Sequence, residues 1–172
     1  MATETSGTNE ILSATANTIS ELTDLMAAVD EDKINTIPYD GSWTAPQLLT
    51  HVTKSIDGMA KVMLMDAKPA ERDPGERIEG LKKAFLDLSN KFDSPGFIVP
   101  EEGPYERQPT INKLNRSFNE FKENVNCANL NYLVEGLPLG PITKLEIVHF
   151  VLYHTQRHLH QMKKICEALK NK

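Results

Sequence analysis

The chain has 172 residues, of which 40% are hydrophobic and 25% charged, so we expect a single globular domain covering residues 1–172. Its 19 Lys and Arg residues against 24 Asp and Glu give a formal charge of −5, which argues against a protein that binds nucleic acid through phosphates. No apolar run reaches the roughly 18 residues that a membrane-spanning helix needs, and the N-terminal residues lack the pattern of a secretion signal, so we expect a cytoplasmic protein without membrane contact.

Helical patterns dominate the chain, and strand patterns are nearly absent. The first expected helix covers residues 9–29, where apolar residues recur at helical spacing. The second covers residues 44–65, because Thr44 and Gln47 have the spacing of a capping box, in which two side chains satisfy backbone N–H groups at a helix start.

The second half of the chain continues the helical pattern after an interruption. A third helix is expected over residues 73–92, followed by a region with four prolines, residues 94–109, that cannot continue a helix. The fourth helix should begin at Thr110. The last helix should begin with a second capping box, Thr143 with Glu146, and run to about residue 169. These elements predict an all-α antiparallel bundle.

Two of the five histidines share an inward face of the last helix. At about 100° per residue, His158 lies about 40° and Gln161 about 20° from His154, among large apolar residues. His149 and His160 fall on other faces of the same helix, so we expect them at the surface or at a rim.

A third histidine is expected to point inward from the second helix. His51 lies on an apolar stripe of that helix, about 40° from Ser55. Three inward histidines are unfavourable without partners, because each unpartnered buried ring nitrogen costs about 1–3 kcal/mol.

A metal site would satisfy all three imidazoles. His154 and His158 present their rings one helical turn apart, and His51 would supply a third ligand from across the bundle. Three neutral imidazoles leave positions open for water or substrate, as in catalytic rather than structural zinc sites. Gln161 and Ser55 would support the ligands or line the substrate pocket. The alternative is that the histidines are core residues, hydrogen-bonded to a carbonyl or carboxylate.

Two short motifs in this chain resemble the DinB-like (YfiT-type) superfamily. One is Ser42–Val52, with a tryptophan, a helix start and a histidine eight positions further on. The other is Tyr153–Gln161, with the pattern His-x-x-x-His followed closely by Gln. The resemblance implies a DinB-like four-helix bundle with a divalent metal, nickel or zinc, held by His51, His154 and His158. Residues 68–109 fit it poorly, and we interpret them as an extra helix and a Pro-rich loop inserted between the second and third bundle helices.

The resemblance also implies an activity. Members of the superfamily include metal-dependent enzymes that transfer low-molecular-weight thiols to small electrophilic substrates, and members are often homodimers. The residues do not decide between thiol transfer and hydrolysis by activated water, and no residue outside the three histidines can be assigned as acid or base. The rival hypothesis is a non-catalytic bundle that binds a small ligand or partner, with the histidine cluster empty or structural.

Other features of the chain receive plainer interpretations. Cys127 and Cys166 lack the spacing of a metal or redox pair, so we expect both to be structural. A second apolar stripe on the last helix predicts packing within the bundle or, alternatively, a dimer interface. Three basic residues, Arg157, Lys163 and Lys164, are interpreted as a solvated face rather than an anion site. A carboxylate-bearing thiol would become more plausible if they and Arg107 bordered the histidine pocket.

Overall fold

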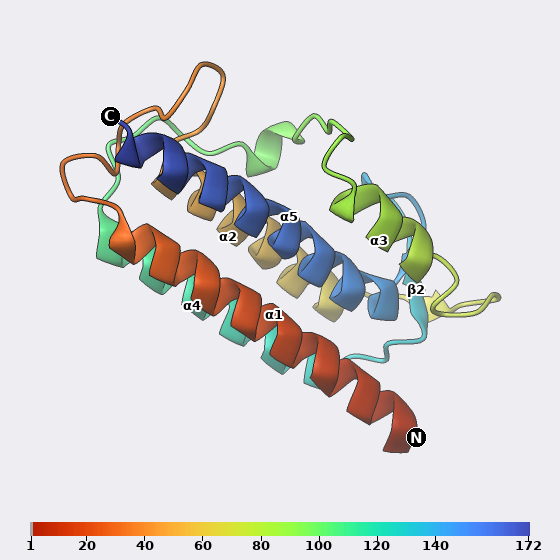
Figure 1. The fold of residues 1–172 in the computed structure, drawn as a ribbon. Coiled ribbons are helices and arrows are strands. Elements are labelled where there is room, and N and C mark those ends of the chain that lie inside the picture. Colours follow the sequence, from red (N-terminus) through yellow and green to blue (C-terminus); the bar gives the residue numbers. More distant parts are fainter. Residues whose placement is uncertain (1) are drawn as a thin grey trace.

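Four long helices form the body of the molecule in a computed structural model that describes residues 2–172, with side chains from Gly7 onward. Figure 1 shows α1 and α5 running side by side, with α2 and α4 behind them and α3 lying alongside one end of α5. The helices are α1 (Ala2–Ala28), α2 (Ala45–Leu64), α3 (Ile78–Leu86), α4 (Arg107–Cys127) and α5 (Lys144–Lys170). The described chain is therefore mostly helical, as the apolar periodicity predicted.

Both predicted capping boxes are present. The Thr44 hydroxyl accepts from the Gln47 backbone N–H, and the Gln47 side chain accepts from the Thr44 N–H. Thr143 and Glu146 make the same reciprocal pair at the start of α5. Because each box satisfies backbone donors that would otherwise be orphaned, it fixes where the helix begins.

A small sheet corrects the prediction of an all-α fold. The strands β1 (Lys68–Pro69), β2 (Tyr132–Val134) and β3 (Ile142–Thr143) pair antiparallel in the order β1-β2-β3. Leu133 lies opposite both Lys68 and Thr143, so the sheet joins the segments before α3, after α4 and before α5. Strands of two or three residues are too short to produce an alternating pattern in the sequence.

The third helix is shorter than predicted. Residues 73–77 form turns instead of the first helical turn, because the Asp73 carboxylate accepts from the Gly75 N–H and the Arg77 N–H donates to Glu146 on α5. After Leu86 the chain leaves the helix, makes a turn at residues 88–89, and continues to the short 3₁₀ helix η1 (Gly96–Ile98).

The fourth helix begins earlier than predicted. Glu106, not Thr110, is its N-cap, and the Thr110 hydroxyl donates to the Glu106 carbonyl from within the first turn. Pro109 lies inside that turn, where the N–H that proline lacks has no intrahelical acceptor. The helix-breaking region therefore ends before Arg107, and Pro109 belongs to α4.

The second apolar stripe of α5 packs inside the bundle. Val148 and Leu152 are buried, and the Cys166 thiol lies 3.8 Å from the Leu25 carbonyl of α1. This stripe therefore covers α1 in the same chain. In the described part of the chain, no helix combines the length and apolar character needed to cross a bilayer.

Candidate metal centre

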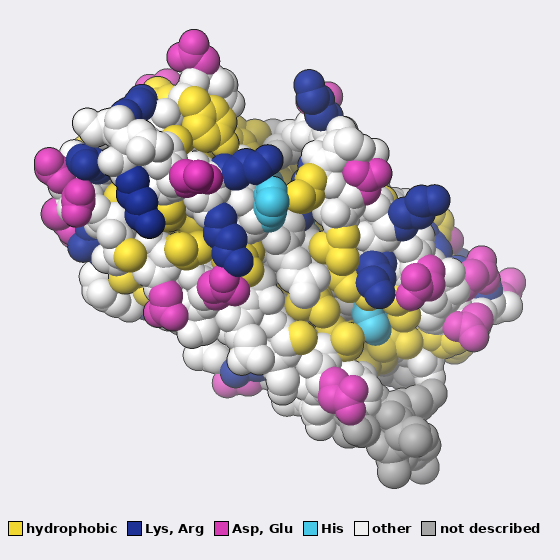
Figure 2. All heavy atoms as spheres, in the orientation of Figure 1, with side chains coloured by type: hydrophobic (Ala, Val, Ile, Leu, Met, Phe, Trp, Pro, Cys, Tyr) yellow, Lys and Arg dark blue, Asp and Glu magenta, His cyan; other side chains and the backbone are white. Residues whose placement is uncertain are grey.

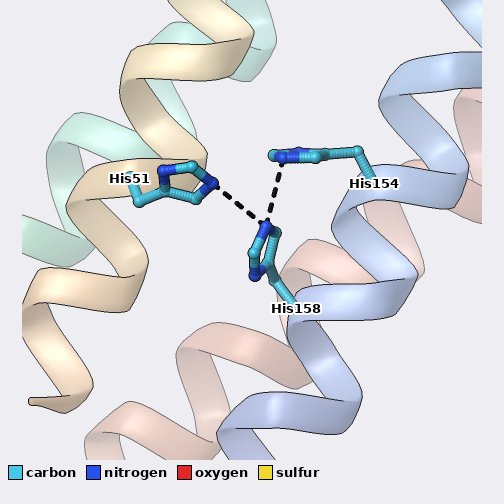
Figure 3. A group of neighbouring side chains, drawn as sticks. All are labelled: His51, His154 and His158. Carbon is cyan, nitrogen blue, oxygen red and sulfur yellow. Dashed lines mark hydrogen bonds between the residues drawn. The ribbon is translucent and has the colours of Figure 1, made fainter. Parts of the chain in front are cut away.

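Three buried histidines meet where α2 faces α5. His51 comes from α2, and His154 and His158 come from adjacent turns of α5, as Figure 3 shows. The Nε2 atom of His158 lies 3.1 Å from Nε2 of His51 and 3.1 Å from Nε2 of His154. The helical angles predicted this convergence, since residues on the inward stripes of two facing helices must meet in the core.

The outer nitrogen of two rings is fixed by a hydrogen bond. His51 Nδ1 lies 3.0 Å from the Ile98 carbonyl oxygen, and His158 Nδ1 lies 3.0 Å from Oε1 of Gln161. Both partners are acceptors, so each Nδ1 carries the proton and donates it. The Nε2 atoms of these two neutral rings are then left with lone pairs, and those lone pairs face each other at 3.1 Å.

Burial keeps the three rings uncharged. Removal from water lowers the pKa of His51, although the Ile98 hydrogen bond opposes the shift. It holds the pKa of His154 well below the ordinary histidine range, with the neighbouring histidines adding to the effect. It lowers the pKa of His158 to about 3. Neutral imidazole is the form that binds metal ions, so the cluster is in its ligating state at neutral pH.

The spacing of the donor atoms is close to what one ion requires. Bonds of about 2.1 Å allow two donors to lie about 3–4.2 Å apart, depending on the angle between them. The two 3.1 Å separations fall in this range, and all three donor atoms lie within 4.8 Å of one another. For a tetrahedral centre the third pair of donors, which lies at most 4.8 Å apart, would close to about 3.4 Å, a movement that rotation of the rings can supply. The donor set therefore fits a divalent ion.

A large cavity opens on the cluster. Its volume is about 1060 Å³, and its lining includes all three histidines together with the predicted pocket residues Ser55 and Gln161. Aromatic rings surround the donors: Trp43 lies 4.8 Å from His51, and Phe150 lies 5.3 Å from His154, measured between ring centroids. The centre is thus reached through a cavity whose lining next to the donor atoms is aromatic.

A comparison with protein families agrees with this arrangement. The model of the DinB superfamily matches residues 14–162, which is most of the chain. The chain belongs to the DinB superfamily. No curated protein and no solved structure shows significant similarity to it. The match confirms the resemblance carried by the two histidine motifs, and it extends through residues 68–109, whose interpretation as an insertion stays a prediction.

The remaining histidines of this DinB superfamily protein lie outside the cluster. His149 is half-buried, with Nδ1 3.3 Å from the Tyr153 hydroxyl, and burial lowers its pKa. His160 is exposed, and it lines the outer part of the cavity. Both positions agree with the faces that the helical angles assigned.

The four basic residues divide between two environments. Arg157 and Lys164 are part of the cavity lining; Arg157 is half-buried there, and Lys164 is exposed. Arg107 instead contacts the Val29 carbonyl and Glu31, and Lys163 pairs with a carboxylate of α1 at 2.6 Å.

Two elements of the site were missed from the sequence. One is the backbone carbonyl of Ile98, since a carbonyl carries no residue-specific signal. The other is the role of Arg157, which the sequence identifies only as a basic residue that could border the pocket, and which donates to the backbone carbonyls of residues 85, 87 and 90.

Proposed function

We propose that this DinB superfamily protein is a metal-dependent enzyme in which His51, His154 and His158 hold a divalent ion, nickel or zinc, and which acts on a small electrophilic substrate. The proposal is carried by one observation: the Nε2 lone pairs of His51 and His158 face each other at 3.1 Å while their protons are held on Nδ1. Two acceptors at this distance repel each other, and a cation between them removes the repulsion.

The chain's own residues prepare the site for such an ion. The Ile98 carbonyl and the Gln161 amide hold two rings in the tautomer that aims Nε2 inward. The cluster contributes no carboxylate, so three neutral ligands leave the charge of the ion uncompensated and further coordination positions open. A divalent ion bound there would supply a Lewis acid that lowers the pKa of a bound thiol or water.

Transfer of a small thiol is the reaction we favour over hydrolysis. In that reaction the thiol loses its proton to water, the thiolate sulfur forms a bond to an electrophilic carbon, and the electron pair of the bond that breaks at this carbon leaves with the displaced group. The support is the basic side chain of Lys164 in the cavity lining, which would pair with a carboxylate of a low-molecular-weight thiol. Hydrolysis has no comparable feature in its favour.

Calorimetric titration of the untagged, chelator-treated protein with Ni²⁺ and Zn²⁺ tests the proposal. We expect one ion per chain, and a loss of affinity of at least about 100-fold in the His51→Ala and His158→Ala variants, each of which removes a ligand. His149→Ala is the matched control, because it removes a histidine of the same helix outside the cluster, and it should bind as the wild type does. Absence of stoichiometric binding, or binding that ignores both ligand variants, would favour the non-catalytic bundle instead.

A further inference from the structure

The cavity wall formed by residues 85–99 is unusually apolar for a segment at the surface. Phe92 is 50% exposed and Phe97 68% exposed, and Leu88 and Val99 are exposed as well. All four line the cavity that opens on the histidine cluster. Exposed apolar side chains that gather around one hollow mark a binding surface, since scattered ones would not share a cavity.

This cavity wall is held in place from both ends. Arg157 donates through Nη1 to the carbonyls of Phe85 and Asp87, at 3.2 and 3.0 Å, and its guanidinium lies 5.0 Å from the Phe92 ring centroid. At the other end, Ile98 accepts from His51 and Val99 accepts from Lys54. The aromatic rings are therefore presented on an anchored backbone, which lowers the entropy cost of binding a ligand against them.

The charges around the cavity are mostly positive. Among the described residues, its lining contains one carboxylate, Asp93, and four basic side chains: Lys54, Lys91, Arg157 and Lys164. Lys54 is engaged by Glu101 at 2.5 Å, and Arg157 by the backbone of the wall. Lys91 and Lys164 are exposed and make no ion pair within the described part of the chain. Figure 2 shows apolar and basic side chains adjoining on the face that carries α5.

We infer that the electrophilic substrate is a compound with a flat apolar body that packs against the exposed ring of Phe97 and the exposed part of Phe92, whose ring already stacks on Phe85, and that it is neutral or anionic but not cationic. This inference rests on the proposed function and adds a substrate class to it. Aromatic side chains favour an aromatic substrate, because offset stacking of the rings adds to the free energy gained by burying apolar area. A cation would approach a net positive lining, whereas an anion would be drawn to Lys91 and Lys164.

Binding is measured by calorimetry with three probes: naphthalene-2-carboxylate, 2-naphthylmethylammonium and acetate. The naphthalene carboxylate should bind, the ammonium compound with the same body should bind at least about tenfold more weakly, and acetate should not bind measurably. Trp43 is the only tryptophan of the chain and lines the cavity. Its fluorescence emission therefore gives a second measure of binding for acetate and Ni²⁺, which contain no naphthalene ring.

Variants at the wall test whether these two rings form the binding surface. Phe92→Ala and Phe97→Ala should each weaken naphthalene carboxylate about 5- to 10-fold, while leaving the nickel affinity unchanged. Leu64→Ala is the control, because Leu64 is 64% exposed on α2 and lies outside the cavity lining. All three changes are at exposed positions, and circular dichroism should show unaltered helix content.

The outcomes distinguish this inference from the metal proposal. Nickel binding without naphthalene carboxylate binding overturns the substrate class alone. Naphthalene carboxylate binding that the two Phe variants do not weaken, or equal binding of the ammonium probe, overturns it as well. Binding of the carboxylate without any nickel binding overturns the metal proposal and supports the apolar, anion-tolerant character of the cavity.

Discussion

Replacing Gln161 with Leu tests the most specific feature of the metal centre. Oε1 of Gln161 accepts the Nδ1 proton of His158 at 3.0 Å, and this bond keeps Nε2 of His158 free for a metal ion. In Gln161→Leu the proton can move to Nε2, where it donates to Nε2 of His51 or His154, each 3.1 Å away. An entering ion must then displace a proton from its own ligand.

The size of the effect follows from the bond that is lost. Loss of a partner that orients a metal-ligating histidine typically lowers metal affinity about 10- to 100-fold, which is about 1.4–2.7 kcal/mol. The assay is a competition titration of Ni²⁺ against a chromophoric chelator. Gln156→Leu serves as the control, because Gln156 is half-buried on the same helix and lies outside the cavity lining.

Two results would refute this reasoning. Unchanged nickel affinity in Gln161→Leu would mean that the His158 tautomer does not govern binding. An equal loss in Gln156→Leu would show that the effect comes from the helix and not from the hydrogen bond. Gln161→Glu should retain nickel affinity, since a carboxylate oxygen accepts the same proton.

Three further predictions concern the framework around the site. Glu146 is fully buried and accepts hydrogen bonds from Arg72, at 2.6 and 2.7 Å, and from two backbone N–H groups. Glu146→Ala should therefore lower the free energy of unfolding, measured by urea titration, by about 3–5 kcal/mol. The control Glu135→Ala, which breaks the exposed pair with Lys68, should lower it by about 0–1 kcal/mol. Burial alone would raise the pKa of Glu146, but its hydrogen bonds outweigh burial and lower the pKa. The ionised carboxylate therefore stabilises the fold fully above the usual carboxyl pKa, and this stabilisation is lost as the pH falls through the lowered pKa. Glu146→Ala should accordingly make the free energy of unfolding less dependent on pH in the acid range. Arg157→Met should speed backbone hydrogen exchange in residues 87–92 at least about tenfold without changing exchange in α4, because it removes the donors that hold this segment to α5. Equal unfolding energies for the two Glu variants, or uniform exchange in Arg157→Met, would contradict these assignments.

The sequence predicted correctly the helix starts that carry a local capping signal, those of α2 and α5. Thr44 and Thr143 mark their helix starts because a capping box is contained within four consecutive residues. The start of α3 could not be found in this way, since the N–H of Arg77 is taken by Glu146, 69 residues further along the chain. The strands were missed for a similar reason: β2 exists because the distant β1 and the nearby β3 pair with it, not because its own residues alternate.

Helix geometry alone predicted which three histidines form the candidate centre. The inward faces of α2 and α5 place His51, His154 and His158 together once two helices are assumed to face each other. The groups that complete the centre come from an irregular segment, where no periodicity predicts which carbonyl will meet which side chain. The Ile98 carbonyl therefore became visible only in the structure.

Among the described residues, the hydrogen bonds that attach the cavity wall to α2 and α5 all go to main-chain carbonyls of the wall. Arg157 binds three of its carbonyls, His51 binds that of Ile98, and Lys54 binds that of Val99. Every residue type offers the same carbonyl. The side chains of this segment can therefore change during evolution or in a mutant library while the imidazole rings keep their orientation. Selectivity for new compounds can thus diverge in one short stretch of chain without re-engineering the reactive centre.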